Sequence, residues 1–237
     1  MLIIDRLNVF IEASQILHDV SLVVERGALV CLVGRNGAGK TTTLRTVMGY
    51  RRPASGRIEL DGRSLVGRPT HQIARLGVAF APEDSGIFGD LSVADNIAMP
   101  TWTRATTRPA RERIEHAYAV FPKLRAYAAR GGTHLSGGER KMLSIARALA
   151  LDPALLLLDE PFEGLSPAII PQITAGIAAI AGLGCGVLLA ESNIHHLPPQ
   201  ASRLYVLERG EMIYDGPPDA VGRDPAVVRV IGGAGAP

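Results

Sequence analysis

Nine consecutive residues of this chain combine glycine, lysine and threonine in a spacing that suits phosphate binding: Gly34, Arg35, Asn36, Gly37, Ala38, Gly39, Lys40, Thr41 and Thr42. Glycines let the backbone turn so that successive N–H groups face one anion. Lys40 is then placed to reach the outer phosphates, and the Thr41 hydroxyl to ligate Mg²⁺. The stretch lies between a predicted strand at 29–33 and a predicted helix over 41–48, whose N-terminus adds the positive end of its dipole. This arrangement favours a phosphate site over a plain turn.

A second feature is a pair of adjacent carboxylates at the end of an apolar run. Four leucines at 155–158 lead into Asp159 and Glu160, which predicts a buried parallel strand. Neighbouring side chains on a strand point to opposite faces, but the chain bends where a strand ends, so both carboxylates can border one site. Asp159 suits Mg²⁺, directly or through water, and Glu160 suits orienting an attacking water. The alternative is a solvated strand end without function.

A third feature is a helix start rich in small residues. Ser136, Gly137, Gly138 and Glu139 precede a predicted helix over 141–150. Ser136 is expected to cap this helix, and the glycines let a ligand approach its bare N–H groups. A compact domain has little use for two distant phosphate sites. Two copies placed head to tail would set each phosphate loop against the other copy's Ser-Gly-Gly helix, which predicts a dimer with two composite sites.

The elements that must position these residues alternate between strand and helix. Apolar patterns predict strands at 2–11, 18–27, 57–62, 77–81, 154–158, 186–190, 203–207 and 211–216. Helices are predicted at 70–76, capped by Thr70, and at 167–183. Between 83 and 152 the signals are helical. Alternating strands and helices predict an α/β fold whose mostly parallel sheet has helices on both faces, with a helical insertion.

Composition sets broad limits on the protein class. The chain has 237 residues, of which 47% are hydrophobic, and a net charge of +2 from 25 Lys and Arg against 23 Asp and Glu. These values are ordinary for a globular protein and do not indicate a nucleic-acid-binding stripe. No apolar run reaches the roughly 18 residues of a membrane span, and the start lacks a signal-peptide pattern, so we expect a cytoplasmic protein. Cys31 and Cys185 lie in apolar runs and are expected to be structural.

In this order and spacing, the three motifs resemble those of the ATPases of ATP-binding cassette (ABC) transporters. Residues 34–42 and 155–160 are similar to the two Walker motifs of that family, and residues 135–139 to its signature sequence. The resemblance covers nearly the whole chain. It implies one domain over 1–237, with a P-loop NTPase (RecA-like) core at 1–82 and 153–216 that includes an N-terminal antiparallel β subdomain. It also implies a helical signature subdomain at 83–152 and a C-terminal helix and tail at 217–237.

The resemblance also implies an activity and partners. The chain would be a motor subunit that binds ATP and Mg²⁺ and hydrolyses ATP to ADP and phosphate. Its implied partners are a second ATPase subunit, identical or related, integral-membrane permease subunits and, indirectly, a periplasmic solute-binding protein. No nucleic-acid partner is expected. The implied location is cytoplasmic and peripheral, on the inner face of the plasma membrane through the permeases.

Finer features resemble the branched-chain amino-acid importer ATPases of the LivF type. Most cassettes have Gln after the strand that precedes the helical insertion, whereas this chain has Glu83 there. By resemblance Glu83 meets Mg²⁺ or the attacking water. The alternative for Glu83 is an exposed loop carboxylate. Branched-chain amino acids are the default solute, and urea, amides, other amino acids and aromatic acids are alternatives. Trp102, the single tryptophan, is expected to pack within a Thr- and Pro-rich link, and the alternative is a contact to the membrane partner.

Three features depart from the family pattern, and the first is Asp84-Ser85, where the subfamily usually has Gly-Arg. The adenine-stacking aromatic aligns with Ile11, and Phe10 is one residue away, so adenine could rest on the apolar Ile11 with weaker stacking. The position of the switch histidine aligns with Ser192. His195 and His196 lie a few residues further on and could substitute, although a packing or surface role is the commoner one for such histidines.

Three other function classes are alternatives to an importer motor. The departures at Ile11 and Ser192 fit a nucleotide-sensing, weakly hydrolytic partner of a second cassette. A soluble cassette protein of DNA repair or translation would need a long coiled-coil insert or tandem cassettes, which 237 residues do not show. A simple P-loop kinase would leave the Ser-Gly-Gly helix unexplained.

Overall fold

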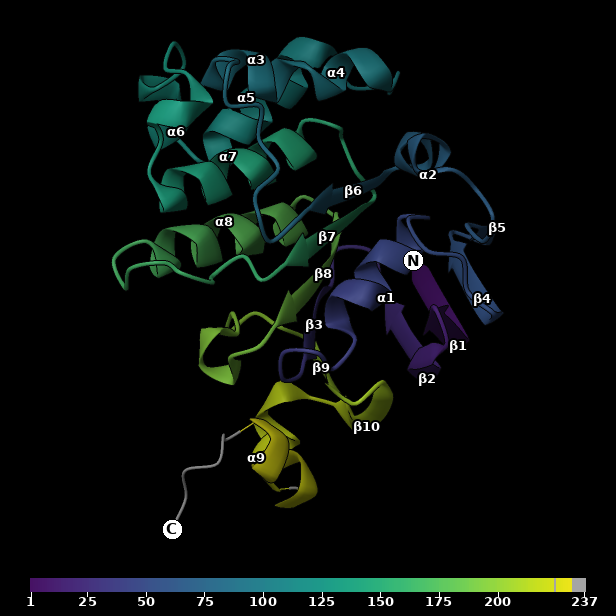
Figure 1. Cartoon of the computed structure of the whole chain (residues 1–237). Helices are drawn as coiled ribbons and strands as arrows, with labels where there is room; N and C mark the ends of the chain where they lie inside the picture. The colour runs from purple at the N-terminus through teal and green to yellow at the C-terminus, as the bar shows by residue number, and fades with distance from the viewer. Residues whose placement is uncertain (224, 232–237) are drawn as a thin grey trace.

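A six-stranded sheet lies at the centre of the molecule (Figure 1). The structure is a computed structural model that describes residues 1–223 and 225–231, the last segment without the side chains of 226 and 231. The strand order is β10-β9-β3-β8-β7-β6; β10 is antiparallel to β9, and the other neighbours are parallel. The strands are β3 (Leu29–Val33), β6 (Val78–Ala81), β7 (Leu155–Asp159), β8 (Gly186–Glu191), β9 (Arg203–Glu208) and β10 (Glu211–Gly216).

A second, antiparallel sheet is formed mainly by the N-terminal part of the chain. Its order is β2-β1-β4-β5. Its members are β1 (Leu2–Ile11), β2 (Ser14–Val24), β4 (Ser55–Leu60) and β5 (Arg63–Ser64). The pairing of β1 with β2 has register shifts, one of them between Val9 and Phe10. This sheet is the antiparallel subdomain that the family resemblance implies.

Helices cover both faces of the central sheet. In Figure 1, α1 lies between the two sheets, α8 lies along the opposite face, and α3 to α7 gather at one end of the molecule. The α-helices are α1 (Lys40–Val47), α2 (Thr70–Leu76), α3 (Val93–Ala98), α4 (Pro100–Thr103), α5 (Ala110–Val120), α6 (Lys123–Ala126), α7 (Gly137–Leu149), α8 (Ile170–Gly182) and α9 (Pro225–Ile231). Short 3₁₀ turns are η1 (Gly132–His134), η2 (Ile194–His196) and η3 (Pro218–Arg223).

Alternate residues of the central strands point into two separate cores, as the period of a strand requires. In β3, Cys31 and Val33 face the core shared with α7 and α8, whereas Val30 and Leu32 face the core shared with α1 and the antiparallel sheet. Cys31 and Cys185 are both buried, and burial raises the pKa of each thiol to about 12. Both cysteines are therefore packed, unreactive side chains, in agreement with the structural role predicted for them.

The predicted fold class is confirmed, but three local predictions are wrong. Thr70 is the first residue of α2 rather than its cap, because Pro69 precedes the helix in an extended conformation. Helix α7 begins at Gly137, four residues before the predicted start, because the Ser136 cap stabilises two glycines in its first turn. Trp102 does not pack within its link: it lies on α4 and is 74% exposed. The predicted tail at 232–237 lies outside the described residues.

The carboxyl ends of the parallel strands meet at one edge of the sheet. β3 leads into the glycine-rich loop, β7 ends at Asp159, and β8 ends at Glu191. Because β8 pairs with both β3 and β7, these three strand ends are neighbours. Within residues 1–223 and 225–231, no helix combines the length and the apolar character that crossing a membrane requires.

Candidate active site

The glycine-rich loop connects β3 to the N-terminus of α1. Gly37 and Gly39 have φ values of +82° and +111°, which few other residues adopt. Gly34 has a packing reason instead, since a Cβ there would lie 2.2 Å from the backbone oxygen of Leu207. The loop residues Asn36, Gly37, Gly39, Lys40, Thr41 and Thr42 line a pocket of about 360 Å³. The nine residues predicted from sequence therefore form one turn at a helix N-terminus, the geometry that binds anions.

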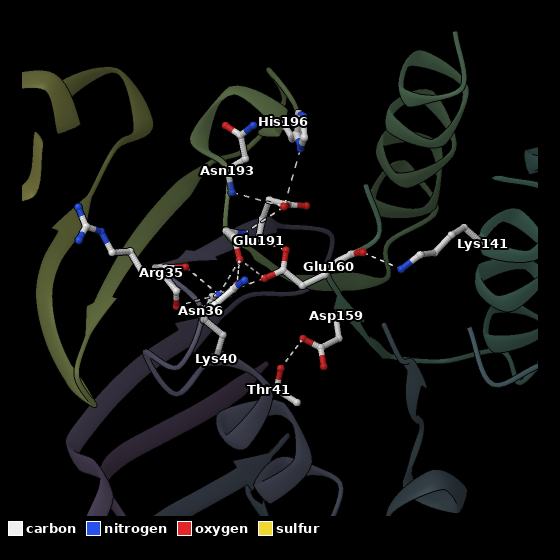
Figure 2. Close-up of polar contacts among 12 residues, drawn as sticks. Arg35, Asn36, Lys40, Thr41, Lys141, Asp159, Glu160, Glu191, Asn193 and His196 are labelled. Carbon is white, nitrogen blue, oxygen red and sulfur yellow. Dashed lines mark hydrogen bonds and ion pairs between the residues drawn. The ribbon is translucent and has the colours of Figure 1, made fainter. Parts of the chain in front are cut away.

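Lys40 is folded back over this loop and is 4% exposed. Its Nζ donates to the backbone oxygens of Gly34 at 2.7 Å and Arg35 at 3.3 Å. It also donates to Ser192 Oγ at 3.0 Å and lies 3.0 Å from Glu160 Oε1 (Figure 2). The lysine thus joins the loop to the ends of β7 and β8.

The side chain of Arg35 takes a different direction from its neighbours. Its Nε donates to the backbone oxygen of Val230 at 3.1 Å, and its Nη2 to that of Arg229 at 3.1 Å. Both carbonyls belong to the last turn of α9. Arg35 therefore contributes backbone to the loop, whereas its guanidinium caps the C-terminal helix.

Thr41, which lines the pocket, is hydrogen-bonded to Asp159 at the end of β7. The Thr41 hydroxyl donates to Asp159 Oδ1 at 3.0 Å. Burial, helped by the charges of Glu160 and Glu83 and opposed by the Thr41 hydrogen bond, raises the pKa of Asp159 from 3.8 to about 6. A buried carboxylate with a hydroxyl beside it is a hard oxygen set of the kind that Mg²⁺ prefers. These residues fit the predicted cation.

Glu160 leaves the strand in an unusual backbone conformation. Its φ is +46°, and this left-handed turn carries its side chain to the same site as Asp159. Its Oε2 accepts from Ser192 N at 3.0 Å, and its Oε1 contacts Ser192 Oγ. Burial alone would raise the pKa of Glu160, but hydrogen bonds from Glu191 and Ser192 and the charge of Lys40 lower it below its ordinary value. The side chain is thus held as a carboxylate.

The predicted second anion site lies on the N-terminus of α7. Ser136 and Glu139 form a capping box: Ser136 Oγ accepts from Glu139 N at 3.4 Å, and Glu139 Oε2 accepts from Ser136 N at 2.9 Å. A Cβ at Gly138 would lie 2.8 Å from Ile169, whereas none of the described atoms lies within 4 Å of one at Gly137. None of Ser136, Gly137, Gly138 and Glu139 lines the loop pocket. Within one chain, the two predicted anion sites remain apart.

The remaining predicted residues lie around the pocket in different ways. Ile11 lines it, together with Ile16, whereas Phe10 is 46% exposed and does not. Glu83 also lines it, as does Glu163, and the side chain of Glu83 is exposed. Within the described part of the chain, no group of three or more acidic, histidine or cysteine side chains is arranged to hold a metal.

The two candidate substitutes for a switch histidine do not reach the pocket. His195 is exposed, and His196 packs edge-on against Phe162 with ring centroids 5.8 Å apart. Ser192 contacts three residues that line it: besides Lys40 and Glu160, its Oγ donates to Asn36 Oδ1 at 2.7 Å. The serine hydroxyl therefore stands between the glycine-rich loop and Glu160.

Known proteins are similar to this chain in sequence. Residues 17–163 match the family described as "ABC transporter". The chain belongs to the ABC transporter family. It is 41% identical to BraG of Pseudomonas aeruginosa, a "High-affinity branched-chain amino acid transport ATP-binding protein", over 90% of this chain and 91% of BraG. It is 37% identical to LptB of Acidithiobacillus ferridurans, a "Lipopolysaccharide export system ATP-binding protein", over 91% of this chain and 89% of LptB.

Solved structures agree on the fold of this ABC protein. A nucleotide-free ATP-binding cassette from an ABC transporter superposes with a TM-score of 0.85 at 22% identity, covering 97% of each chain. A cassette in its ADP conformation gives 0.84 at 22% identity over 96% of each. The chain is thus an ATP-binding cassette, the subunit type that hydrolyses ATP to power transport.

Sequence reasoning missed two buried residues of the cassette's site. Glu191 ends β8 beside Glu160, and Lys141 donates from Nζ to the backbone oxygens of Glu83 at 2.6 Å and Glu160 at 2.7 Å. The signal for Glu191 was available, because it ends an apolar strand run as Asp159 does. The signal for Lys141 was not, because a helical lysine is ordinarily solvated.

Replacing Asp159 with asparagine should stabilise the cassette in the absence of nucleotide and divalent cations. The pKa of Asp159 is higher in the folded chain than the ordinary 3.8, so its stabilising contribution is present below about pH 4 and is lost as pH rises to about 6. At pH 7 the folded chain carries a buried charge that asparagine removes, and the free energy of unfolding should rise by about 2 kcal/mol. Denaturant unfolding at pH 7 measures this.

The same pair of proteins should differ far less at pH 4, where Asp159 is protonated in the folded state. The exposed Asp90 provides a matched control, and Asp90→Asn should leave stability unchanged at both pH values. Equal stability of the wild type and Asp159→Asn at pH 7 would contradict the predicted cost of this carboxylate.

Proposed function

We propose that this cassette drives an importer for branched-chain or related amino acids. The observation that carries the proposal is its 41% identity with BraG, a transport ATPase whose name specifies branched-chain amino acids, over nine-tenths of both chains. The LivF-like Glu83 and the Glu-Ser-Asn run at 191–193 support the same subfamily. Urea, amides and aromatic acids are alternative solutes for an importer of this type.

The proposed site assigns each residue a step in ATP hydrolysis. The loop N–H groups and Lys40 bind the phosphates, and the apolar Ile11 and Ile16 at the pocket wall receive the adenine. Thr41 and Asp159 would hold Mg²⁺, which neutralises phosphate charge when bound. Glu160 accepts a hydrogen bond from the attacking water and aligns it with the outer phosphate.

Two further side chains complete the proposed site. Ser192 takes the switch position. Its hydroxyl contacts Lys40 and Glu160, so a change in either residue when the outer phosphate binds or leaves would also change the contacts of Ser192. Glu83, at the pocket rim, is placed to approach the cation or the attacking water once ATP is bound. This role of Glu83 follows from the family resemblance.

The proposed active unit contains two cassettes, identical or related. Ser136 and Gly137 lie outside the pocket of their own chain, and the space beside Gly137 is open. A partner's phosphates therefore have room to approach the capped N-terminus of α7. Head-to-tail pairing would complete two composite sites, and the N-terminus of α7 in each cassette would then face the phosphates bound by the other.

A second pocket, of about 670 Å³, fits a permease segment. Its apolar lining includes Phe80, Phe88 and Met99, and its charged lining is Arg45, Arg51, Arg147 and Asp84. Three cations against one carboxylate favour an amphipathic helix with acidic residues. Helix α4, which carries the exposed Trp102, borders this pocket through Pro100 and Thr103. Through such a contact the cassette would lie on the inner face of the plasma membrane, and the permeases would receive solute from a periplasmic binding protein.

The LptB relatives support a second candidate, an export cassette for lipopolysaccharide. The identity of 37% over 91% of this chain is only slightly lower than that with BraG. The two candidates share the ATPase site and differ in the permease that docks. The solute therefore has to be decided by transport and not by hydrolysis.

Deletion of the gene in its source organism tests the proposal. We expect uptake of radiolabelled leucine, isoleucine and valine at micromolar concentration to fall sharply, and plasmid-borne wild-type protein to restore it. Unchanged uptake of these amino acids, with defective lipopolysaccharide at the cell surface, would favour the second candidate. Unchanged uptake with a loss of urea or amide transport would keep the importer and replace the solute.

A further inference from the structure

Glu191 is a buried carboxyl that the proposed hydrolysis mechanism does not use. It is 2% exposed and ends β8, the strand beside β7. In Figure 2 it lies on the side of Glu160 that faces away from Thr41. A carboxyl this deep is costly unless it is neutral or fully paired. The hydrogen-bond partners of Glu191 therefore indicate whether the fold holds it charged or neutral.

All donors around Glu191 face one of its two oxygens. Oε1 accepts from Ser192 N at 3.1 Å and Asn193 N at 3.4 Å, and His196 Nδ1 lies 3.8 Å away. Asn193 Oδ1 accepts from His195 N, which leaves the Asn193 amide NH₂ facing His196 Nε2 at 3.4 Å. His196 Nε2 must then be the acceptor, so Nδ1 carries the ring proton and directs it towards Glu191.

The second oxygen has a different neighbour. Oε2 of Glu191 is buried, and no nitrogen or hydroxyl donor of the described residues reaches it. The carboxyl lies beside that of Glu160, because one backbone N–H, that of Ser192, is within 3.1 Å of an oxygen of each. Two carboxylates in contact repel each other unless they share a proton. Since the donors occupy Oε1 and Oε2 has none, the proton belongs on Oε2, which makes Glu191 the neutral member of the pair.

One backbone N–H group fixes the position of the two carboxyls relative to each other. The N–H of Ser192 is shared between Glu160 Oε2 at 3.0 Å and Glu191 Oε1 at 3.1 Å. Lys40 also contacts Glu160, but the proposed mechanism turns Lys40 towards the phosphates of ATP. After that movement, Glu160 depends on its contacts with Ser192 and Glu191 to hold its orientation.

We propose that Glu191 is a positioning residue for ATP hydrolysis: as a neutral carboxylic acid it donates a hydrogen bond to Glu160 and holds that carboxylate in line with the attacking water. The inference rests on the proposed role of Glu160. Burial, together with the hydrogen bond and the charge of Glu160, raises the pKa of Glu191 to about 8, which is consistent with a neutral acid at physiological pH. The same arrangement explains why a second acid is tolerated beside Glu160.

Two substitutions separate positioning from other roles. Glu191→Gln keeps a donor on one terminal atom and an acceptor on the other, so kcat should stay within about threefold of the wild type. Glu191→Ala removes the donor and leaves Glu160 free to rotate, and kcat should fall by about 10- to 100-fold. The KM for ATP should change little in both variants, because neither removes a phosphate contact. A merely structural role would not produce this split between kcat and KM.

The controls use the same purified protein. Glu208→Ala changes the acid that ends β9, a strand of the same sheet that does not pair with β8, and should leave kcat unchanged. Thermal unfolding and binding of radiolabelled ATP identify any variant that fails to fold, in which case Glu191→Gln alone carries the test. A Glu191→Gln protein that folds, binds ATP and is at least tenfold slower than the wild type would overturn the inference, since it would require an ionised Glu191.

A companion variant separates this inference from the proposed site. Glu160→Gln that retained full activity would remove Glu160 from the mechanism and overturn both. Inactive Glu160→Gln beside fully active Glu191→Ala would overturn only the role of Glu191. Because the assay measures ATP hydrolysis by the purified cassette, the identity of the solute does not affect the result.

Discussion

Replacing Glu160 with glutamine should lower kcat for ATP hydrolysis by at least about 100-fold and leave ATP binding intact. Glutamine keeps the size of the side chain but loses the negative charge that polarises the attacking water. None of the contacts expected to hold the phosphates comes from this side chain. The purified variant should therefore accumulate as an ATP-bound dimer, which size-exclusion chromatography with Mg²⁺ and ATP detects, while phosphate release measures turnover.

The geometry makes this a sharp test of the assignment. Both Glu160 and Glu163 line the pocket, and Glu160 has a lowered pKa. Glu208→Gln, at the end of β9, should hydrolyse ATP at the wild-type rate. Undiminished turnover by Glu160→Gln would remove this residue from its proposed role.

Replacing Lys40 with methionine should weaken ATP binding by about 100-fold, because the phosphates lose a charge-assisted hydrogen bond in a buried site. Hydrolysis should fall with it. The substitution should also destabilise the protein without nucleotide, since Glu160 would lose its buried cationic partner 3.0 Å away, at a cost of about 3 kcal/mol. Equilibrium binding of labelled ATP and denaturant unfolding measure the two effects.

Lys40→Arg is the informative companion. It keeps the charge, so the nucleotide-free protein should remain more stable than Lys40→Met. Its larger planar head does not fit the pair of loop carbonyls that Lys40 contacts, so ATP binding should still be impaired. Wild-type ATP affinity in Lys40→Met would contradict the assignment of this lysine to the phosphates.

Much of the site could be predicted because its signals are local in the sequence. The spacing of Gly34 to Thr42 identifies a loop before a helix, and the apolar run before Asp159 identifies a strand end. The bend that brings Glu160 to the same site was also foreseeable in kind, and the structure shows it as a φ of +46°. The capping role of Ser136 rests on residues three apart, which is equally local.

What could not be predicted depends on which strands are neighbours. The apolar run before Glu191 marks it as a strand end, but its place beside Glu160 follows from the pairing of β8 with β7, which no pattern within residues 186–191 specifies. Lys141 is buried because its helix packs over the end of β7, where it finds two backbone carbonyls. The exposure of Trp102 likewise follows from the placement of α4 at the edge of the fold. The neighbouring sequence suggests the commoner environments, a solvated lysine and a packed tryptophan. The tertiary structure places these two residues differently.

The bonds between Arg35 and the carbonyls of Arg229 and Val230 join residues 194 and 195 positions apart. One end of this bridge is the turn that meets the nucleotide, and the other is the last described helix of the chain. A truncation that removes α9 would therefore not trim a passive extension. It would leave the Arg35 guanidinium unrestrained next to the triphosphate. It would also make the glycine-rich loop, which binds the nucleotide, less rigid.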